Sequence, residues 1–160
     1  MAKEKDVKTN AMRILDRAGV KYEVNTYECG EFIDGVHIAD MLSQEYARSF
    51  KTLVAKGKSG GYHVFALPVD RELDMKKAAK AAGEKSVELI AVKEINKVTG
   101  YIRGGCTPLG MKKQYPTVVD SSAKDFDTII ISGGRLGSQI ILPPEELVRV
   151  TGGKFGEIVV

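Results

Sequence analysis

The segment from Gly100 to Gly110 holds the residues best suited to chemistry in this sequence. It is written GYIRGGCTPLG, so four glycines and one proline fall within eleven residues. Such a loop leaves backbone N–H groups accessible, and neighbouring N–H groups can bind an anion or a polarised carbonyl oxygen. Arg103 adds positive charge beside them. The signature of a nucleotide-hydrolysing P-loop is absent, so the alternative to a binding loop is a plain turn between strands.

Lys51 is the most unusual charged residue, because its neighbours in the run Phe50-Lys-Thr-Leu-Val are mostly apolar. A lysine in such a run either faces outward from a strand or faces a pocket. In a pocket, its ammonium group can bind a phosphate or a carbonyl oxygen. The adjacent Thr52 would then add a hydroxyl group that both donates and accepts hydrogen bonds.

Cys106 lies within the glycine-rich loop, where a thiol nucleophile is conceivable. A cysteine nucleophile needs a base such as histidine, and nothing in the sequence places His37 or His63 next to it. The alternative is a small buried side chain. Neither Cys106 nor Cys29 belongs to a metal-ligand or CxxC spacing, so we expect reduced thiols and no metal site.

A second glycine-rich stretch runs from Ser132 to Ser138 and is written SGGRLGS. It follows an apolar strand and precedes another strand, and it lacks the GxGxxG pattern of dinucleotide-binding loops. A turn that carries a binding residue fits this context better than a phosphate loop.

The elements that position these loops alternate without a regular repeat. Helical spacing of apolar residues predicts helices over 7–18, 36–42, 75–82 and from 144 onwards, with a short one before Gly100. Alternating or β-branched runs predict strands over 21–28, 50–56, 62–68, 117–119, 128–132 and 139–142, and a short apolar run covers 87–92. The runs 50–56 and 62–68 flank a glycine-rich turn and predict a hairpin. We therefore expect an α+β fold and a single domain over residues 1–160.

Composition excludes several classes of protein. The 160 residues carry 24 Lys plus Arg against 21 Asp plus Glu, and 43% are hydrophobic, which excludes a disordered chain. No apolar run approaches the roughly 20 residues that span a bilayer, and the polar start lacks a signal-peptide core. We expect a cytoplasmic protein with no membrane partner. The net charge of +3 does not require a nucleic-acid partner, although clusters such as Lys76, Lys77 and Lys80 form either a solvated face or a local basic patch.

Three motifs in order resemble the YbaK/EbsC family: FKTL at 50–53, GYIRGGCTPLGMKK at 100–113 and ISGGR at 131–135. These proteins are free-standing aminoacyl-tRNA deacylases related to the editing domain inserted in bacterial prolyl-tRNA synthetase. The resemblance covers nearly the whole chain. It implies a mixed α+β fold with a central, six-stranded, barrel-like sheet surrounded by helices. It also implies hydrolysis of the ester between a mischarged amino acid and tRNA, without a metal or cofactor.

The resemblance also implies roles for individual residues. The family's pocket lysine falls on Lys51, which would anchor the terminal adenosine or its phosphate. The family's carbonyl-binding loop falls on Gly104, Gly105, Cys106, Thr107 and Pro108. Further substrate-binding positions fall on Tyr27, Phe32, Thr52, Ser132, Gly133, Gly134 and Gln139. Gln139 stands where the best-known members carry an aspartate, so the resemblance does not carry over a role for a negative charge at that position.

The family typically removes cysteine from proline tRNA, and the thiol of the substrate attacks its own ester to leave as a thiolactone. Such a route needs no Cys/His or Ser/His pair in the protein. Relatives remove alanine by activating water, so a deacylase for alanine or another small amino acid is an alternative. Others are a non-catalytic module that binds aminoacyl-tRNA or a synthetase, and a thiol-handling protein built on Cys106. The implied partners are the aminoacylated 3′ end of tRNA and prolyl-tRNA synthetase.

Overall fold

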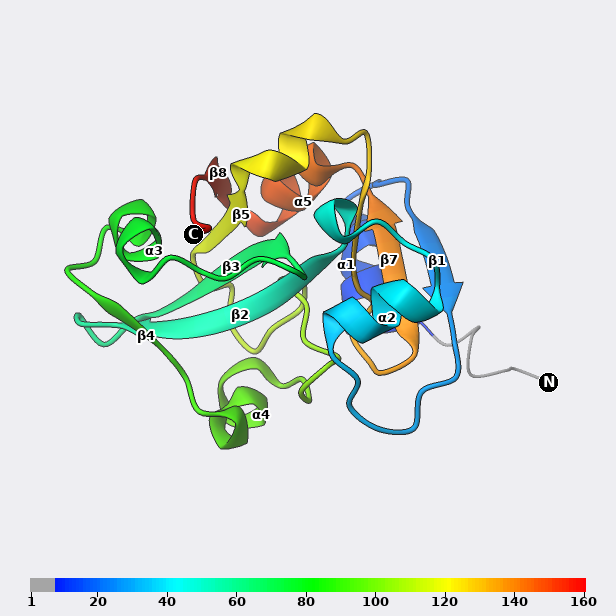
Figure 1. Cartoon of the computed structure of the whole chain (residues 1–160), viewed down its shortest axis with the longest axis horizontal. Coiled ribbons are helices and arrows are strands. Elements are labelled where there is room, and N and C mark those ends of the chain that lie inside the picture. The colour runs from blue at the N-terminus through cyan, green and yellow to red at the C-terminus, as the bar shows by residue number, and fades with distance from the viewer. Residues whose placement is uncertain (1–7) are drawn as a thin grey trace.

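The computed structural model describes residues 8–160 and arranges them in two β-sheets and five α-helices (Figure 1). One sheet has the strand order β1-β7-β6 and contains Glu23–Thr26, Ser138–Leu142 and Ile129–Ser132. The other has the order β4-β2-β3-β5-β8 and contains Val87–Leu89, Phe50–Gly57, Tyr62–Pro68, Thr117–Asp120 and Lys154–Gly156. The predicted mixed α+β fold is therefore confirmed.

The predicted hairpin is formed by β2 and β3, which run across the middle of the molecule in Figure 1. Their antiparallel register places Lys51 opposite Leu67 and Val54 opposite Val64. Gly60 in the turn has a φ of +98°, a left-handed conformation that favours glycine. The glycine-rich segment between the two apolar runs thus turns the chain as the sequence predicts.

The helices also follow the sequence signals. They are α1 (Asn10–Arg17), α2 (Gly35–Met41), α3 (Met75–Ala82), α4 (Ile95–Thr99) and α5 (Pro144–Thr151), with short 3-10 helices η2 (Tyr46–Arg48), η3 (Val92–Glu94) and η4 (Ser121–Asp125). The carboxylate of Asp74 accepts hydrogen bonds from the first N–H groups of α3, and Gly83 ends that helix with a φ of +71°. Val7, the predicted first residue of the first helix, lies outside the described residues.

The single six-stranded, barrel-like sheet is not confirmed, because the described residues form two sheets and no closed barrel. The sheets meet at one isolated parallel bridge, between Ser49 and Ile130 of β6. The edge of β2 that faces away from β3 pairs with β4 only from Ala55 to Gly57. Residues 51–53 therefore have no strand on this edge, and the ring of strands stays open there.

Three hydrophobic clusters hold the sheets in place. The first packs α1 and α5 on the three-stranded sheet through buried side chains that include Leu15, Ile129, Ile140, Leu142 and Leu147. The second packs α3 on the five-stranded sheet and includes Phe65, Leu67, Ala78, Val118 and Ile158. The third, smaller cluster packs α4 on β2 and β3 through Val54, Val64 and Val98. Because the first cluster also includes Phe50 and Ala66, one packed core joins the two sheets next to residues 51–53.

Glu84 fastens the far end of the β2–β3 hairpin. Its carboxylate accepts hydrogen bonds from the backbone N–H and the hydroxyl of Ser59, and it lies 2.7 Å from Nε2 of the buried His63. The Ser59 hydroxyl and the His63 ring lower the pKa of Glu84 to about 2. This network lies at the opposite end of β2 from Lys51 and serves the fold.

Candidate active site

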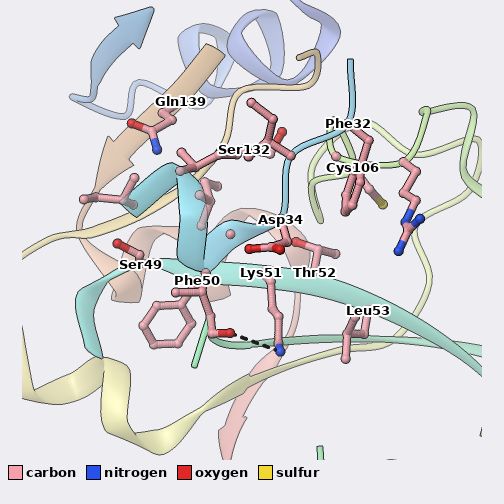
Figure 2. A pocket seen from close by; sticks show the side chains of 18 of the residues that line it. Phe32, Asp34, Ser49, Phe50, Lys51, Thr52, Leu53, Cys106, Ser132 and Gln139 are labelled. Carbon is pink, nitrogen blue, oxygen red and sulfur yellow. Dashed lines mark hydrogen bonds between the residues drawn. The ribbon is translucent and has the colours of Figure 1, made fainter. Parts of the chain in front are cut away.

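A cavity of about 410 Å³ opens beside the unpaired edge of β2 (Figure 2). Its volume suits a small-molecule group rather than a large ligand. Eight of the residues that the resemblance assigns to catalysis or substrate binding line it: Tyr27, Phe32, Lys51, Thr52, Gly104, Cys106, Ser132 and Gln139. Five others lie outside its lining: Gly105, Thr107, Pro108, Gly133 and Gly134. The fold thus brings together segments from both sheets and both glycine-rich loops.

Lys51 reaches the cavity from β2 and is half-buried. Its Nζ donates a hydrogen bond of 3.3 Å to the carbonyl oxygen of Val69. Figure 2 shows the side chain directed towards that oxygen and away from Ser132 and Gln139. Burial lowers the pKa of Lys51, while the negative charges of Glu72, Asp70 and Asp34 partly oppose the shift. Among the described residues, the ammonium group therefore donates one hydrogen bond, which is long and goes to a neutral oxygen that a substrate group can replace.

The loop from Gly104 to Pro108 is shaped for a close backbone approach. Gly104 has a φ of +87°, and a Cβ atom added there would lie 2.8 Å from a methyl carbon of Leu136. The N–H of Gly105 is already used, because it donates to the carbonyl oxygen of Ile102 at 2.9 Å. Pro108 has no N–H. Two residues of the loop, Gly104 and Cys106, line the cavity. The N–H group of neither residue has an acceptor within residues 8–160.

The Cys106 side chain is poorly suited to act as a nucleophile. Burial raises the pKa of its thiol to about 11, although a hydrogen bond with Thr99 partly opposes the shift. The thiol is therefore protonated at neutral pH, whereas the thiolate is the reactive form. Neither cysteine forms a disulfide. The contribution of Cys106 to the cavity is its backbone and a small apolar surface.

The Gln139 side chain is held in a network of amides on the cavity wall. It exchanges two hydrogen bonds with Gln44: Gln44 Nε2 donates to Gln139 Oε1 at 2.9 Å, and Gln139 Nε2 donates to Gln44 Oε1 at 3.1 Å. Asn25 Nδ2 adds a third bond to Gln139 Oε1 at 3.0 Å. An aspartate here could not donate to Gln44. The amide thus ties β7 to β1 and to the segment before η2, and it brings no charge into the cavity.

Phe32 and Arg103 form a stacked pair on the cavity lining. The guanidinium carbon of Arg103 lies 3.9 Å from the centroid of the Phe32 ring, within cation–π range. Phe32 is 40% exposed, and its ring also packs against Gly104, where an added Cβ would approach Cδ1 to 3.0 Å. Tyr27 is partly buried, and this burial raises the pKa of its hydroxyl. Together with Phe50, three aromatic residues therefore line the cavity, and Arg103 lies against the ring of Phe32.

The Ser132 turn lies next to the glycine loop. The Ser132 hydroxyl accepts a hydrogen bond from the N–H of Gly134 at 3.2 Å, and Thr9 donates to the carbonyl oxygen of Gly133 at 2.6 Å. A Cβ atom on Gly105 would lie 3.0 Å from the Cα of Arg135. The two glycine-rich segments thus touch backbone to backbone. Their glycines allow this approach, and Ser132 and Ser138, at the two ends of the turn, line the cavity.

Four polar residues of the cavity were not predicted from the sequence: Asp34, Gln44, Ser49 and Ser138. Asp34 caps α2, and its carboxylate accepts a hydrogen bond from the N–H of His37 at 2.9 Å. That bond and the contact with the His37 ring hold the pKa of Asp34 below its usual value. An aspartate just before a helical run is a recognisable cap signal, but nothing local indicates that Gln44 meets Gln139.

Comparisons with known proteins identify the family. A model of the aminoacyl-tRNA editing domain matches residues 36–150. EbsC of Enterococcus faecalis, provisionally named as a Cys-tRNA(Pro)/Cys-tRNA(Cys) deacylase, is 44% identical over 160 residues, covering 99% of this chain and 98% of that protein. The chain belongs to the aminoacyl-tRNA editing family. The family predicted from the three motifs is confirmed, and with it an enzyme that acts on aminoacyl-tRNA.

Other relatives of this editing domain are more distant. YwhH of Bacillus subtilis, an uncharacterized protein, is 28% identical over 109 residues, covering 68% of this chain and 69% of that protein. The crystal structure of a hypothetical protein superposes with a TM-score of 0.87 at 22% identity, covering 95% of this chain and all of the other. A crystal structure provisionally described as a trans-editing enzyme for prolyl-tRNA synthetase gives 0.79 at 21% identity, covering 96% and 99%. Both likenesses confirm the fold alone.

Within residues 8–160, no group of three or more His, Cys, Asp or Glu side chains is placed to hold a metal ion. No helix in the same residues has the length and apolar character needed to cross a bilayer.

Proposed function

We propose that this editing domain removes a mischarged amino acid, cysteine first, from tRNA(Pro) while acting as a free-standing enzyme in the cytoplasm. The observation that carries the proposal is the cavity beside the open edge of β2, where Lys51 and the glycine loop meet in a member of the editing family. The Enterococcus relative, with its provisional name as a Cys-tRNA deacylase, supports cysteine as the amino acid.

In this proposal the glycine loop binds the ester of the substrate. The N–H groups of Gly104 and Cys106, which have no acceptor within residues 8–160, donate to the carbonyl oxygen and stabilise the negative charge that develops on it. Lys51 exchanges its 3.3 Å bond to Val69 for an oxygen of the terminal adenosine and holds the ester in place. Thr52, Tyr27 and Phe32 complete the wall around the aminoacyl group.

The nucleophile in this proposal is the thiol of the substrate. Its sulfur attacks the ester carbonyl carbon, the bond to the ribose oxygen breaks, and the proton lost by the thiol goes to that oxygen, leaving a thiolactone and a free tRNA end. This route fits a cavity whose own thiol is protonated, because burial raises the pKa of Cys106 to about 11. It also gives selectivity, because a pocket alone separates small side chains poorly.

Deacylation assays test the proposal directly. We expect rapid release of cysteine from Cys-tRNA(Pro), little release of alanine from Ala-tRNA(Pro), and loss of the first activity in Lys51→Ala. Lys58→Ala, which removes an exposed lysine from the hairpin turn, is the matched control and retains activity. Release of alanine instead would indicate activation of water, and binding without hydrolysis of either substrate would indicate a non-catalytic module.

Prolyl-tRNA synthetase is the partner we propose for tRNA selection. The net charge of +3 supports only weak binding of tRNA by the domain alone, and such binding weakens as salt is added. We therefore expect the synthetase to raise the rate of deacylation at physiological salt. Binding of tRNA that does not change between low and high salt would contradict this reasoning.

A further inference from the structure

We propose that Arg103, braced on Phe32, binds the phosphodiester group that precedes the terminal nucleoside of the tRNA 3′ end. The inference rests on the proposed deacylase function and adds to it the site for the charged part of the substrate. It assigns the phosphate to Arg103 and leaves the uncharged adenosine to Lys51.

The stacked geometry prepares the Arg103 side chain for such a ligand. Its guanidinium carbon lies 3.9 Å from the Phe32 ring centroid, so one face of the group is covered by the ring. The N–H donors of a guanidinium lie in its own plane and point outward from its edge, where they match two phosphate oxygens at once. Phe32 in turn packs on Gly104, so the long side chain of Arg103 is held near the cavity. Less conformational entropy is then lost when Arg103 binds a ligand.

No carboxylate of the described residues 8–160 competes for the guanidinium group of Arg103. Within residues 8–160, the Arg103 side chain forms no ion pair or hydrogen bond, and it is exposed. By contrast, the guanidinium of Arg149 is bound at two nitrogens by Glu146, at 2.9 and 2.8 Å. An arginine without a carboxylate partner can bind an anionic ligand without first breaking an ion pair.

Lys51 is the weaker site for a phosphate. Three carboxylates, those of Glu72, Asp70 and Asp34, act on its ammonium group. They would repel a phosphodiester brought to the same place. A neutral ribose hydroxyl or ring nitrogen meets no such repulsion. The charge distribution around the cavity therefore separates a position for an uncharged group at Lys51 from a position for an anion at Arg103.

The chain order connects Arg103 to the reacting ester. Arg103 directly precedes Gly104, whose N–H is proposed to bind the ester carbonyl. In aminoacyl-tRNA the ester is carried by the ribose of the last nucleotide, and the nearest phosphodiester is attached to the same ribose. A group one residue away from the carbonyl site is therefore placed to meet the phosphate.

The test compares two substrates that differ in the phosphate. Arg103→Gln is assayed on Cys-tRNA(Pro) and on 3′-O-cysteinyl adenosine, which carries no phosphate. We expect kcat/KM on the tRNA to fall about tenfold or more, mainly through KM, with no change on the nucleoside ester. The logarithmic salt dependence of tRNA binding should become less steep by about 0.7, as for one lost single-strand phosphate contact. Lys58→Gln, with the same charge change on the distant hairpin turn, is the matched control.

The other outcomes overturn the inference. An equal loss on both substrates would mean that Arg103 shapes the glycine loop, and no loss on either would mean that it contacts only solvent. An equal loss in Lys58→Gln would mean a general effect of charge. If the unaltered protein hydrolyses neither substrate, the proposed function fails by itself. Binding of a CCA-ended RNA stem-loop then tests the phosphate site by itself. Weaker binding by Arg103→Gln than by the unaltered protein supports the site, and equal binding refutes it.

Discussion

Replacement of Gly104 by alanine tests whether the glycine loop must keep its present backbone. Gly104 has a φ of +87°, and the new Cβ would lie 2.8 Å from Cδ2 of Leu136 and 3.0 Å from Cδ1 of Phe32. A non-glycine residue in the left-handed region costs about 1–2 kcal/mol. For a chain of this size, such a loss lowers Tm by about 2–8 °C.

The contacts add a second effect to this backbone strain. Both neighbouring atoms are ends of side chains, so they can move, but the loop or the Phe32 ring must then shift with them. If the N–H of Gly104 binds the oxyanion, its displacement should lower kcat by about 10²–10³, the usual cost of one such donor. Activity should therefore fall much further than the loss of stability explains.

Gly60→Ala is the matched control for Gly104→Ala. Gly60 has a φ of +98° and no atom within 4 Å of an added Cβ, so its replacement introduces the backbone strain without the contacts. Thermal unfolding at pH 7.5 and initial rates on Cys-tRNA(Pro) are measured for both variants. We expect lower Tm in both and lower kcat in Gly104→Ala alone. An unchanged kcat in Gly104→Ala would refute the role of the loop, and an equal loss in Gly60→Ala would assign the effect to stability.

Three further predictions concern other parts of the molecule. Because the pKa of Glu84 is lowered from 4.5 to about 2, its charge stabilises the fold above about pH 4.5. Glu84→Gln should therefore have a lower Tm than the unaltered protein at pH 7. This difference in Tm should disappear as the pH falls from 4.5 towards 2, and a difference that does not depend on pH would contradict the role of the Glu84 charge. Cys106, whose pKa is raised to about 11, should react slowly with iodoacetamide at pH 8 in the native protein, as followed by peptide mass spectrometry; rapid labelling would disprove its burial as a neutral thiol. Gln139→Ala and Gln44→Ala should each destabilise the fold by about 1–3 kcal/mol in urea titrations, and the double variant by less than their sum, whereas simple addition would argue against their mutual bonds.

Local signals predicted the elements of the fold well. The hairpin of β2 and β3, and helix α3 between Asp74 and Gly83, depend on turn and cap residues that lie next to one another in the sequence. Strand β8 was missed, because Lys154–Gly156 is short and gains its structure by parallel pairing with the distant β5. The barrel-like sheet implied by the resemblance was not confirmed, since closure depends on how far strands pair along their edges, which no local pattern specifies.

The cavity was predictable to a similar extent. Glycine-rich spacing and a lysine among apolar residues pointed to Gly104 and Lys51, and both line it. The pattern gave no sign that Gly105 uses its N–H inside the turn, or that Gln139 would meet Gln44. Those contacts join residues that are far apart along the chain or depend on loop conformation. The chemical groups of the cavity were therefore predictable from the sequence, whereas the hydrogen bonds that these groups already form depend on the folded structure.

The unpaired stretch of β2 also bears on aggregation. An exposed strand edge offers free N–H and C=O groups on which a strand of another molecule can add. Here β4 pairs with one end of the edge, the bridge from Ser49 to Ile130 occupies the other, and residues 51–53 between them open into a walled cavity. A foreign strand would find room for only these few residues. The same interruption that leaves space for a substrate is thus too short to recruit a second chain.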